Sequence, residues 1–157
     1  GRKVGVLVTD GVPIDLVHAL TTALDEEGAL LEIIAPQVGG VEASDGSWID
    51  AAQQLPGAPS VLYDAVALLP SAEGVEMLMQ APAARDFVAD AFAHGKFIGY
   101  VEAALPLFEK AGVSDSRDDG CIVLAGPADC AAFVVTCRQL RFWAREAMMP
   151  AVERQGV

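Results

Sequence analysis

Short β-rich runs alternate with helix-like segments along nearly the whole chain, and this alternation constrains the fold more than any other feature. One run is apolar throughout (AVALL), as expected of a strand that is buried on both faces of a parallel sheet. Strands that alternate with helices predict right-handed crossovers and helices on both faces of the sheet. We therefore expect a flavodoxin-like, doubly wound α/β fold with a mainly parallel sheet, formed by Lys3–Thr9, Leu30–Ala35, Ala65–Leu69, Phe97–Val101 and Cys121–Leu124.

The segments between these runs carry signals for helices. Leucines repeat at helical spacing behind Pro13, and Gly28 supplies the stop. Further helices are expected over Ala72–Gln80, over Pro82–His94 and in a short segment that ends at Gly112. The longest is predicted at about Pro127–Ala147, with an apolar stripe formed by Phe133, Cys137, Leu140 and Ala144.

One segment departs from the α/β alternation. Gly40–Ile49 (GVEASDGSWI) holds Asp45-Gly46 between two short runs, which is typical of a β-hairpin turn. We expect this hairpin to stand outside the parallel set of strands.

Length and charge limit the classes of function. A chain of 157 residues fits one domain, 1–157. It has no initiator Met and opens at Gly1-Arg2-Lys3, almost directly before an apolar run, which suggests a fragment of something longer. The net charge of −12 repels phosphate backbones and anionic lipid, so we expect no nucleic-acid and no membrane partner. Three sparse cysteines are not a secreted disulfide framework and favour a cytoplasmic protein.

A site in such a fold is expected where the strands end. The strand ends offer Thr9-Asp10-Gly11, Pro70-Ser71-Ala72 and Tyr100-Val101-Glu102. Glu102 stands at a strand–turn–helix elbow, where it could act as a base or nucleophile, but a solvated residue at a helix start is the favoured interpretation. His18 and His94 are isolated and favour structural roles, so we expect no metal site.

Two further groups of side chains allow two interpretations each. Cys121, Cys130 and Cys137 are expected to be buried small hydrophobes instead of reactive thiols. The basic stripe of Arg138, Arg141 and Arg145 fits either an acidic partner face or local salt bridges. Phe142 and Trp143, beside that stripe, are either interface anchors or buried residues.

Several segments, in this order, resemble the C-terminal domain of large-subunit monofunctional haem catalases. They are Gly1–Val12, Gly40–Ile49, Ala58–Val66, Asp86–Gly99 and Arg138–Arg145. The resemblance implies a domain related to intracellular proteases and class I glutamine amidotransferases, placed after a catalase core that decomposes hydrogen peroxide.

The resemblance also implies that the catalytic residues of that wider superfamily are missing. Its active members carry Cys-His at the elbow, where this chain has Glu102-Ala103, and an acidic residue near Val12 or Pro13, where this chain has none. Their Pro-Gly-Gly turn is replaced by Pro70-Ser71-Ala72. Nucleophile, acid partner and oxyanion turn are the parts that acyl transfer needs, so no catalytic, cofactor-binding or metal residue is assigned.

We therefore expect a non-catalytic accessory domain without a cofactor of its own. The chain contains no asparagine, which the haem site of a catalase uses, so the haem is expected in the parent core. The implied partners are that core and a homo-oligomer, a tetramer of the parent enzyme. Two alternatives remain: a free-standing amidotransferase-like hydrolase, and a chaperone-like binding module.

Overall fold

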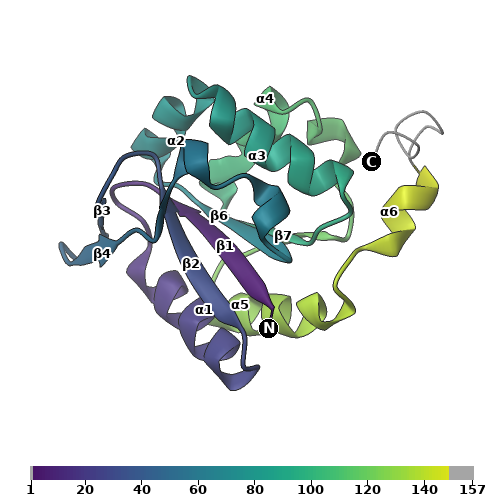
Figure 1. The fold of residues 1–157 in the computed structure, drawn as a ribbon, viewed down its shortest axis with the longest axis horizontal. Coiled ribbons are helices and arrows are strands. Elements are labelled where there is room, and N and C mark those ends of the chain that lie inside the picture. Colours follow the sequence, from purple (N-terminus) through teal and green to yellow (C-terminus); the bar gives the residue numbers. More distant parts are fainter. Residues whose placement is uncertain (1, 149–157) are drawn as a thin grey trace.

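The computed structural model describes residues 2–148 and contains a central six-stranded sheet (Figure 1). The strands pair in the order β5-β2-β1-β6-β7-β8, and every pairing in this sheet is parallel. The predicted parallel sheet is confirmed, and all five predicted runs contribute strands to it, but the sheet also contains β5, which was not predicted. Its strands are β1 (Lys3–Val8), β2 (Leu30–Ala35), β5 (Gln53–Gln54), β6 (Ala65–Leu69), β7 (Ile98–Tyr100) and β8 (Cys121–Val123).

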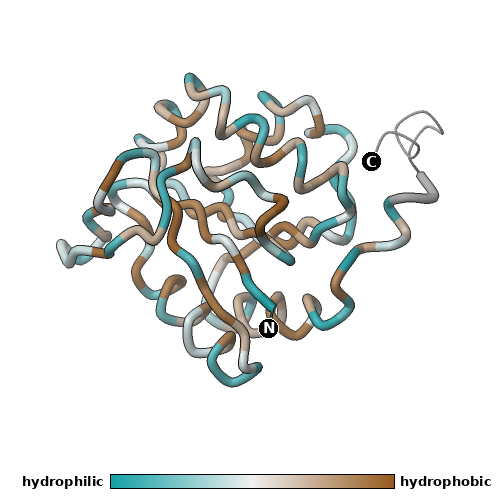
Figure 2. Tube along the Cα trace, viewed as in Figure 1, coloured by the Kyte–Doolittle hydropathy of each residue, from teal (hydrophilic) through white to brown (hydrophobic). Residues whose placement is uncertain are grey.

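Helices cover both faces of the sheet, as the alternation predicts. One face carries α1 (Ile14–Glu26) and α5 (Pro127–Thr136), which pack against each other. The other carries α2 (Ala72–Met79), α3 (Pro82–Ala93) and the short α4 (Leu105–Lys110), as Figure 1 shows. Apolar colour follows the central strands between these two layers in Figure 2. The fold is therefore the doubly wound α/β architecture expected from the sequence.

The predicted hairpin is also confirmed. β3 (Gly40–Glu42) and β4 (Trp48–Asp50) pair antiparallel and form a separate two-stranded sheet. It projects from the body of the molecule at the left of Figure 1. Gly40 has φ +144°, and a Cβ there would lie 2.1 Å from the carbonyl oxygen of Ile49, so glycine is required at this crossing.

The prediction of one long C-terminal helix is wrong. Helix α5 ends at Thr136, a short 3-10 turn follows, and Leu140 has φ +67°, which ends the helical path. A second helix, α6, then covers Trp143–Met148. Of the predicted apolar stripe, only Phe133 and Cys137 are buried, whereas Leu140 is 47% exposed.

Tertiary contacts explain this break. The backbone N–H of Phe142 donates to the carbonyl of Gly95 (2.6 Å), and the Phe142 ring packs edge-on against Phe97. Beyond it, the side chain of Arg145 is buried against Asp118. A straight helix would carry these groups away from the sheet. The segment from Leu140 to Arg145, here called the C-terminal strap, instead lies along the edge where the strands begin.

Candidate functional site

The carboxyl ends of β1 and β6 meet at the centre of the sheet, where a site in this fold is expected. A network of hydrogen bonds fills this position. The backbone N–H of Ser71 donates to the hydroxyl of the buried Thr9 (2.9 Å). The Ser71 hydroxyl donates to the carbonyl of Asp10 (2.6 Å) and accepts from the N–H of Gly74 (3.0 Å) as the cap of α2. The turn's Ser71 donor is therefore satisfied inside the fold.

Helix α2 lies unusually close to the end of β1. A Cβ added to Gly74 would be 1.9 Å from the Thr9 hydroxyl oxygen, a distance that real Cβ atoms do not show. The Thr9 side chain thus fills the space between this turn and α2. The arrangement supports a packed structural joint more than a binding site.

We expect Gly74→Ala to destabilise the domain. The new methyl group would displace the buried Thr9 hydroxyl from Ser71 N, and such overpacking typically costs about 1–3 kcal/mol of unfolding free energy. Urea unfolding followed by circular dichroism measures this loss. The matched control is Gly57→Ala, because a Cβ at Gly57 meets no atom within 4 Å. Equal stability of the two variants would contradict the close packing.

The elbow after β7 carries Glu102-Ala103, as the sequence predicts. Glu102 is exposed and begins a short 3-10 turn, Glu102–Ala104, that leads into α4. The two histidines lie on other elements: His18 is exposed on α1, and His94 ends α3. Among the described residues, no hydrogen bond joins either histidine to Glu102.

The carboxylate expected to be missing after the first strand has a partial substitute. Asp10 lies two residues beyond the end of β1, but its side chain accepts a hydrogen bond from the backbone N–H of Glu42 (2.9 Å). The N–H of Gly11 donates to the carbonyl of Glu42 in return (2.8 Å). Asp10 therefore fastens the β3–β4 hairpin to the sheet.

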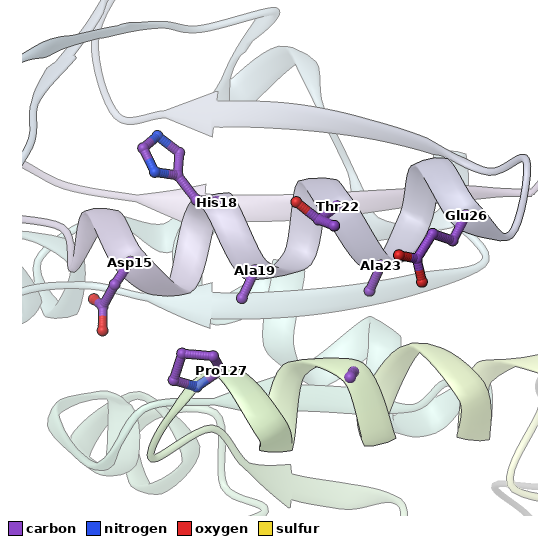
Figure 3. A pocket seen from close by; sticks show the side chains of 8 residues that line it. Asp15, His18, Ala19, Thr22, Ala23, Glu26 and Pro127 are labelled. Carbon is purple, nitrogen blue, oxygen red and sulfur yellow. The ribbon is translucent and has the colours of Figure 1, made fainter.

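Two shallow hollows of similar volume lie on the part of the chain that the structure describes. One, of about 390 Å³, lies at the carboxyl edge and is lined by Thr9, Asp10, Gly11, Glu73, Gly74 and Met77. The other, of about 410 Å³, lies between α1 and α5 (Figure 3). In the second, Ala19 and Ala23 point toward α5, whereas His18, which also lines the hollow, points away from α5. Within residues 2–148, no group of three or more His, Cys, Asp or Glu side chains is arranged to hold a metal ion.

The cysteines are placed as buried hydrophobes, as expected, although Cys121 is only partly covered. Burial raises the pKa of Cys130 to about 11 and that of Cys137 to about 12, and it also raises the pKa of Cys121. Thiols with raised pKa values are poor nucleophiles at neutral pH, which supports the structural interpretation.

The three arginines of the basic stripe differ in their contacts, so the two interpretations that the sequence left open apply to different residues. Arg138 pairs with Glu27, which caps the end of α1, and Arg145 forms a two-pronged ion pair with Asp118 (2.6 and 2.9 Å). These two arginines therefore make local salt bridges. The guanidinium of Arg141 reaches only main-chain carbonyls, those of Asp64 and Leu140, among the described contacts.

Sequence reasoning missed one buried polar pair. Lys96 is 2% exposed, and its ammonium group donates to the carbonyl of Ser60. The hydroxyl of Ser60 is buried without a hydrogen-bond partner among residues 2–148. The two residues are 36 positions apart, and nothing in their spacing signals the contact.

Comparison of structures shows the class of fold. The domain superposes on oxidised DJ-1 of Toxoplasma gondii with a TM-score of 0.73, over 92% of this chain and 94% of that one, at 16% identity. It superposes on a mutant of a DJ-1 superfamily protein from Salmonella typhimurium with a TM-score of 0.74, over 96% and 100%, at 21% identity. These likenesses define a DJ-1/ThiJ/PfpI-like domain and show the fold alone.

Sequence comparison shows the family. Residues 1–147 match the family model of the C-terminal domain found in long catalases, and the chain belongs to this family. It is 56% identical over 146 residues to catalase C of Rhizobium meliloti (strain 1021), covering 93% of this chain and 21% of that protein. It is 33% identical over 124 residues to catalase HPII of Mycobacterium avium, covering 78% and 18%. The chain thus spans about a fifth of these relatives. No helix within residues 2–148 has the length and apolarity to span a membrane.

Proposed function

We propose that this domain stabilises a long haem catalase by packing on its core and takes no part in the chemistry. The parent enzyme decomposes hydrogen peroxide, works as a homo-oligomer that we infer to be a tetramer, and resides in the cytoplasm. Membership of the family of C-terminal domains of long catalases supports this parentage. Three free cysteines without a disulfide support the compartment.

The hydrogen-bonded joint at the carboxyl edge carries the non-catalytic part of the proposal. Thr9 accepts from the N–H of Ser71, and the Ser71 hydroxyl accepts from that of Gly74, so these donors already have partners. Oxyanion stabilisation needs donors aimed at a substrate oxygen, and here those two are aimed at side chains. With an exposed Glu102 at the elbow, the superfamily's acyl chemistry has no place to occur.

The tyrosines of the domain do not fit a haem site. The hydroxyl of Tyr63 donates to Glu32 (3.0 Å), and that of Tyr100 accepts from Arg117 (2.8 Å); both rings are buried in the core. Burial raises the pKa of Tyr63 well above its ordinary value, which opposes the tyrosinate form that ligates iron in catalases. This supports placing the haem in the parent core.

Removal of residues 1–157 from the parent catalase should shorten its survival under heat while leaving haem chemistry possible. Inter-domain contacts typically bury about 600–1,500 Å², which is enough to slow the unfolding of an assembly. The measurement compares inactivation half-lives of truncated and full-length enzyme at equal haem occupancy. Indistinguishable half-lives with identical oligomers would contradict the stabilising role.

The hydrolase alternative has its own test in the same full-length protein. Peptidase, amidase or glyoxalase activity that disappears in Glu102→Ala would replace the proposal, since Glu102 is the elbow residue. The matched control is Glu109→Ala on α4, an exposed carboxylate away from the elbow.

A further inference from the structure

Exposed apolar side chains gather where the strands of the sheet begin, the amino edge. Val61 and Leu62 lie in a 3-10 turn, Ser60–Leu62, that leads into β6, and both are exposed. Leu140 and Trp143 belong to the C-terminal strap, and Trp143 is 66% exposed. We call these four residues the amino-edge patch.

Hydrogen bonds hold the two halves of this patch side by side. The Arg141 guanidinium, next to Leu140, donates to the carbonyl of Asp64, just beyond the turn (3.4 Å). Lys96, just before β7, donates to Ser60 in that turn, and Phe142 donates to Gly95. Both segments are thus fixed to the starts of β6 and β7.

The patch is rigidly built, which distinguishes it from an apolar loop tip. Arg145 anchors the strap by donating to the carbonyls of Phe92 (3.0 Å) and Lys96 (2.9 Å) in addition to its ion pair. Its guanidinium also lies 4.2 Å from the centre of the Phe92 ring. An exposed tryptophan on a fixed frame, with an arginine beside it, is typical of interface anchors.

We infer that the amino-edge patch is the surface by which this domain docks on the catalase core of its own chain. The inference rests on the proposed function and adds which surface of the domain makes the contact and which part of the protein covers that surface. β1 begins at Lys3 on the same edge, and its N–H donates to Asp64 beside the patch (2.7 Å). In a family of C-terminal domains the core precedes the domain, so the connecting chain enters beside the patch.

The core is favoured over other binding partners of the patch because it is joined covalently to the domain. A segment joined next to a binding surface has a high effective concentration there, so modest contacts suffice to hold it. Most of each curated relative lies outside the matched region, which covers 21% of the Rhizobium protein, so the tethered partner is large. The Arg141 guanidinium offers this partner a cation at the border of the apolar surface.

Two tryptophans give an internal comparison for the first test. Trp48, on the hairpin at the opposite edge, is 60% exposed, close to the value for Trp143. In the unmodified full-length catalase, hydroxyl radicals from X-ray radiolysis label both side chains, and mass spectrometry reads the rates. We expect the oxidation rate of Trp143 to be lower than that of Trp48 by a factor of about five or more, because a side chain buried in an interface is shielded from water. Equal rates, or a shielded Trp48, would overturn the inference.

Controls identify what shields Trp143. A full-length chain that ends at Met148 must retain the shielding, since its loss would assign the cover to residues 149–157 of the chain itself. Amine cross-links from Lys3, on the same edge, must reach peptides of the core. Cross-links to the equivalent domain of another subunit would assign the patch to a second copy and overturn the inference.

Variants supply the second test. Trp143→Asp and Leu62→Asp should each speed proteolytic release of the domain from the full-length enzyme about tenfold, while Trp48→Asp changes it less than twofold. The reverse pattern would make the hairpin the docking face. Failure of the proposed function gives a different result: removal of the domain would then leave the inactivation half-life of the enzyme unchanged. A shortened half-life with an unshielded Trp143 would refute only the choice of face.

Discussion

Arg145→Met is expected to lower the free energy of unfolding by about 3–5 kcal/mol. The substitution leaves the carboxylate of Asp118 with no opposite charge at a largely buried position, where its exposed fraction is 12%. It also removes the donors to the carbonyls of Phe92 and Lys96. Losing one partner of a buried ion pair costs more than the pair contributes, because the other charge stays desolvated. Urea unfolding followed by circular dichroism measures the change.

Arg138→Met is the matched control for this prediction. Arg138 also pairs with a carboxylate, that of Glu27, but its side chain is mostly exposed and water can replace the lost partner. Its loss of stability should be far smaller. A comparable loss in both variants would show that burial of the Arg145 pair is not what matters.

The domain is expected to gain stability from Lys96 as the pH rises from about 8 to about 10.5. Burial, assisted by the positive charge of Arg141, lowers the pKa of Lys96 from 10.5 to about 8, while the carboxylates of Asp64 and Asp90 oppose the shift. Below pH 8 the folded protein bears the full cost of a buried ammonium ion. Above it the folded state releases the proton before the unfolded state does, so stability rises, in total by about 3 kcal/mol.

The measurement is the difference in unfolding free energy between the wild type and Lys96→Met across this pH range. A difference is needed because other groups act in the opposite direction. The raised pKa values of Cys130 and Cys137 make stability fall above about pH 9, where the unfolded thiols ionise, and these contributions cancel between the two proteins. A difference that stays constant or declines with pH would contradict the buried state of Lys96.

Most of the sheet could be predicted because each of these strands is a short continuous run of residues that favour β structure. The run at Ala65–Leu69 is apolar at every position, and all five residues are buried. The exception is β5, which consists of Gln53 and Gln54 and pairs with the end of β2. Two glutamines carry no β signal of their own, so only their position beside β2 makes them a strand.

The C-terminal helix shows where local signals fail. The segment after Pro127 has helical periodicity, yet the chain turns at Leu140 in a backbone conformation that leucine seldom adopts. The cause is the packing of Arg145 against Asp118, 27 positions earlier in the chain, and of Phe142 against Gly95, 47 positions earlier. Tertiary contacts outweigh helix propensity here.

Topology predicts where a site would lie in this fold, but the packing at that position could not be predicted. Strand ends identify Thr9, Ser71 and Glu102 as neighbours of the position where chemistry occurs in this fold. The occupation of the Ser71 donor by Thr9 joins residues 62 positions apart, and it depends on how closely Gly74 lets α2 approach. Such sub-ångström packing is not encoded in any motif.

The strap has a consequence for the order in which the domain is made. Asp118, Phe92 and Lys96 leave the ribosome before Arg145, so their carboxylate and carbonyl groups lack this partner until the last helix emerges. Synthesis runs from the amino terminus, so this edge of the domain stays open until α6 has been made. Closure of the strap is therefore a late step in the folding of the domain, and under the docking that we infer it also completes the amino-edge patch.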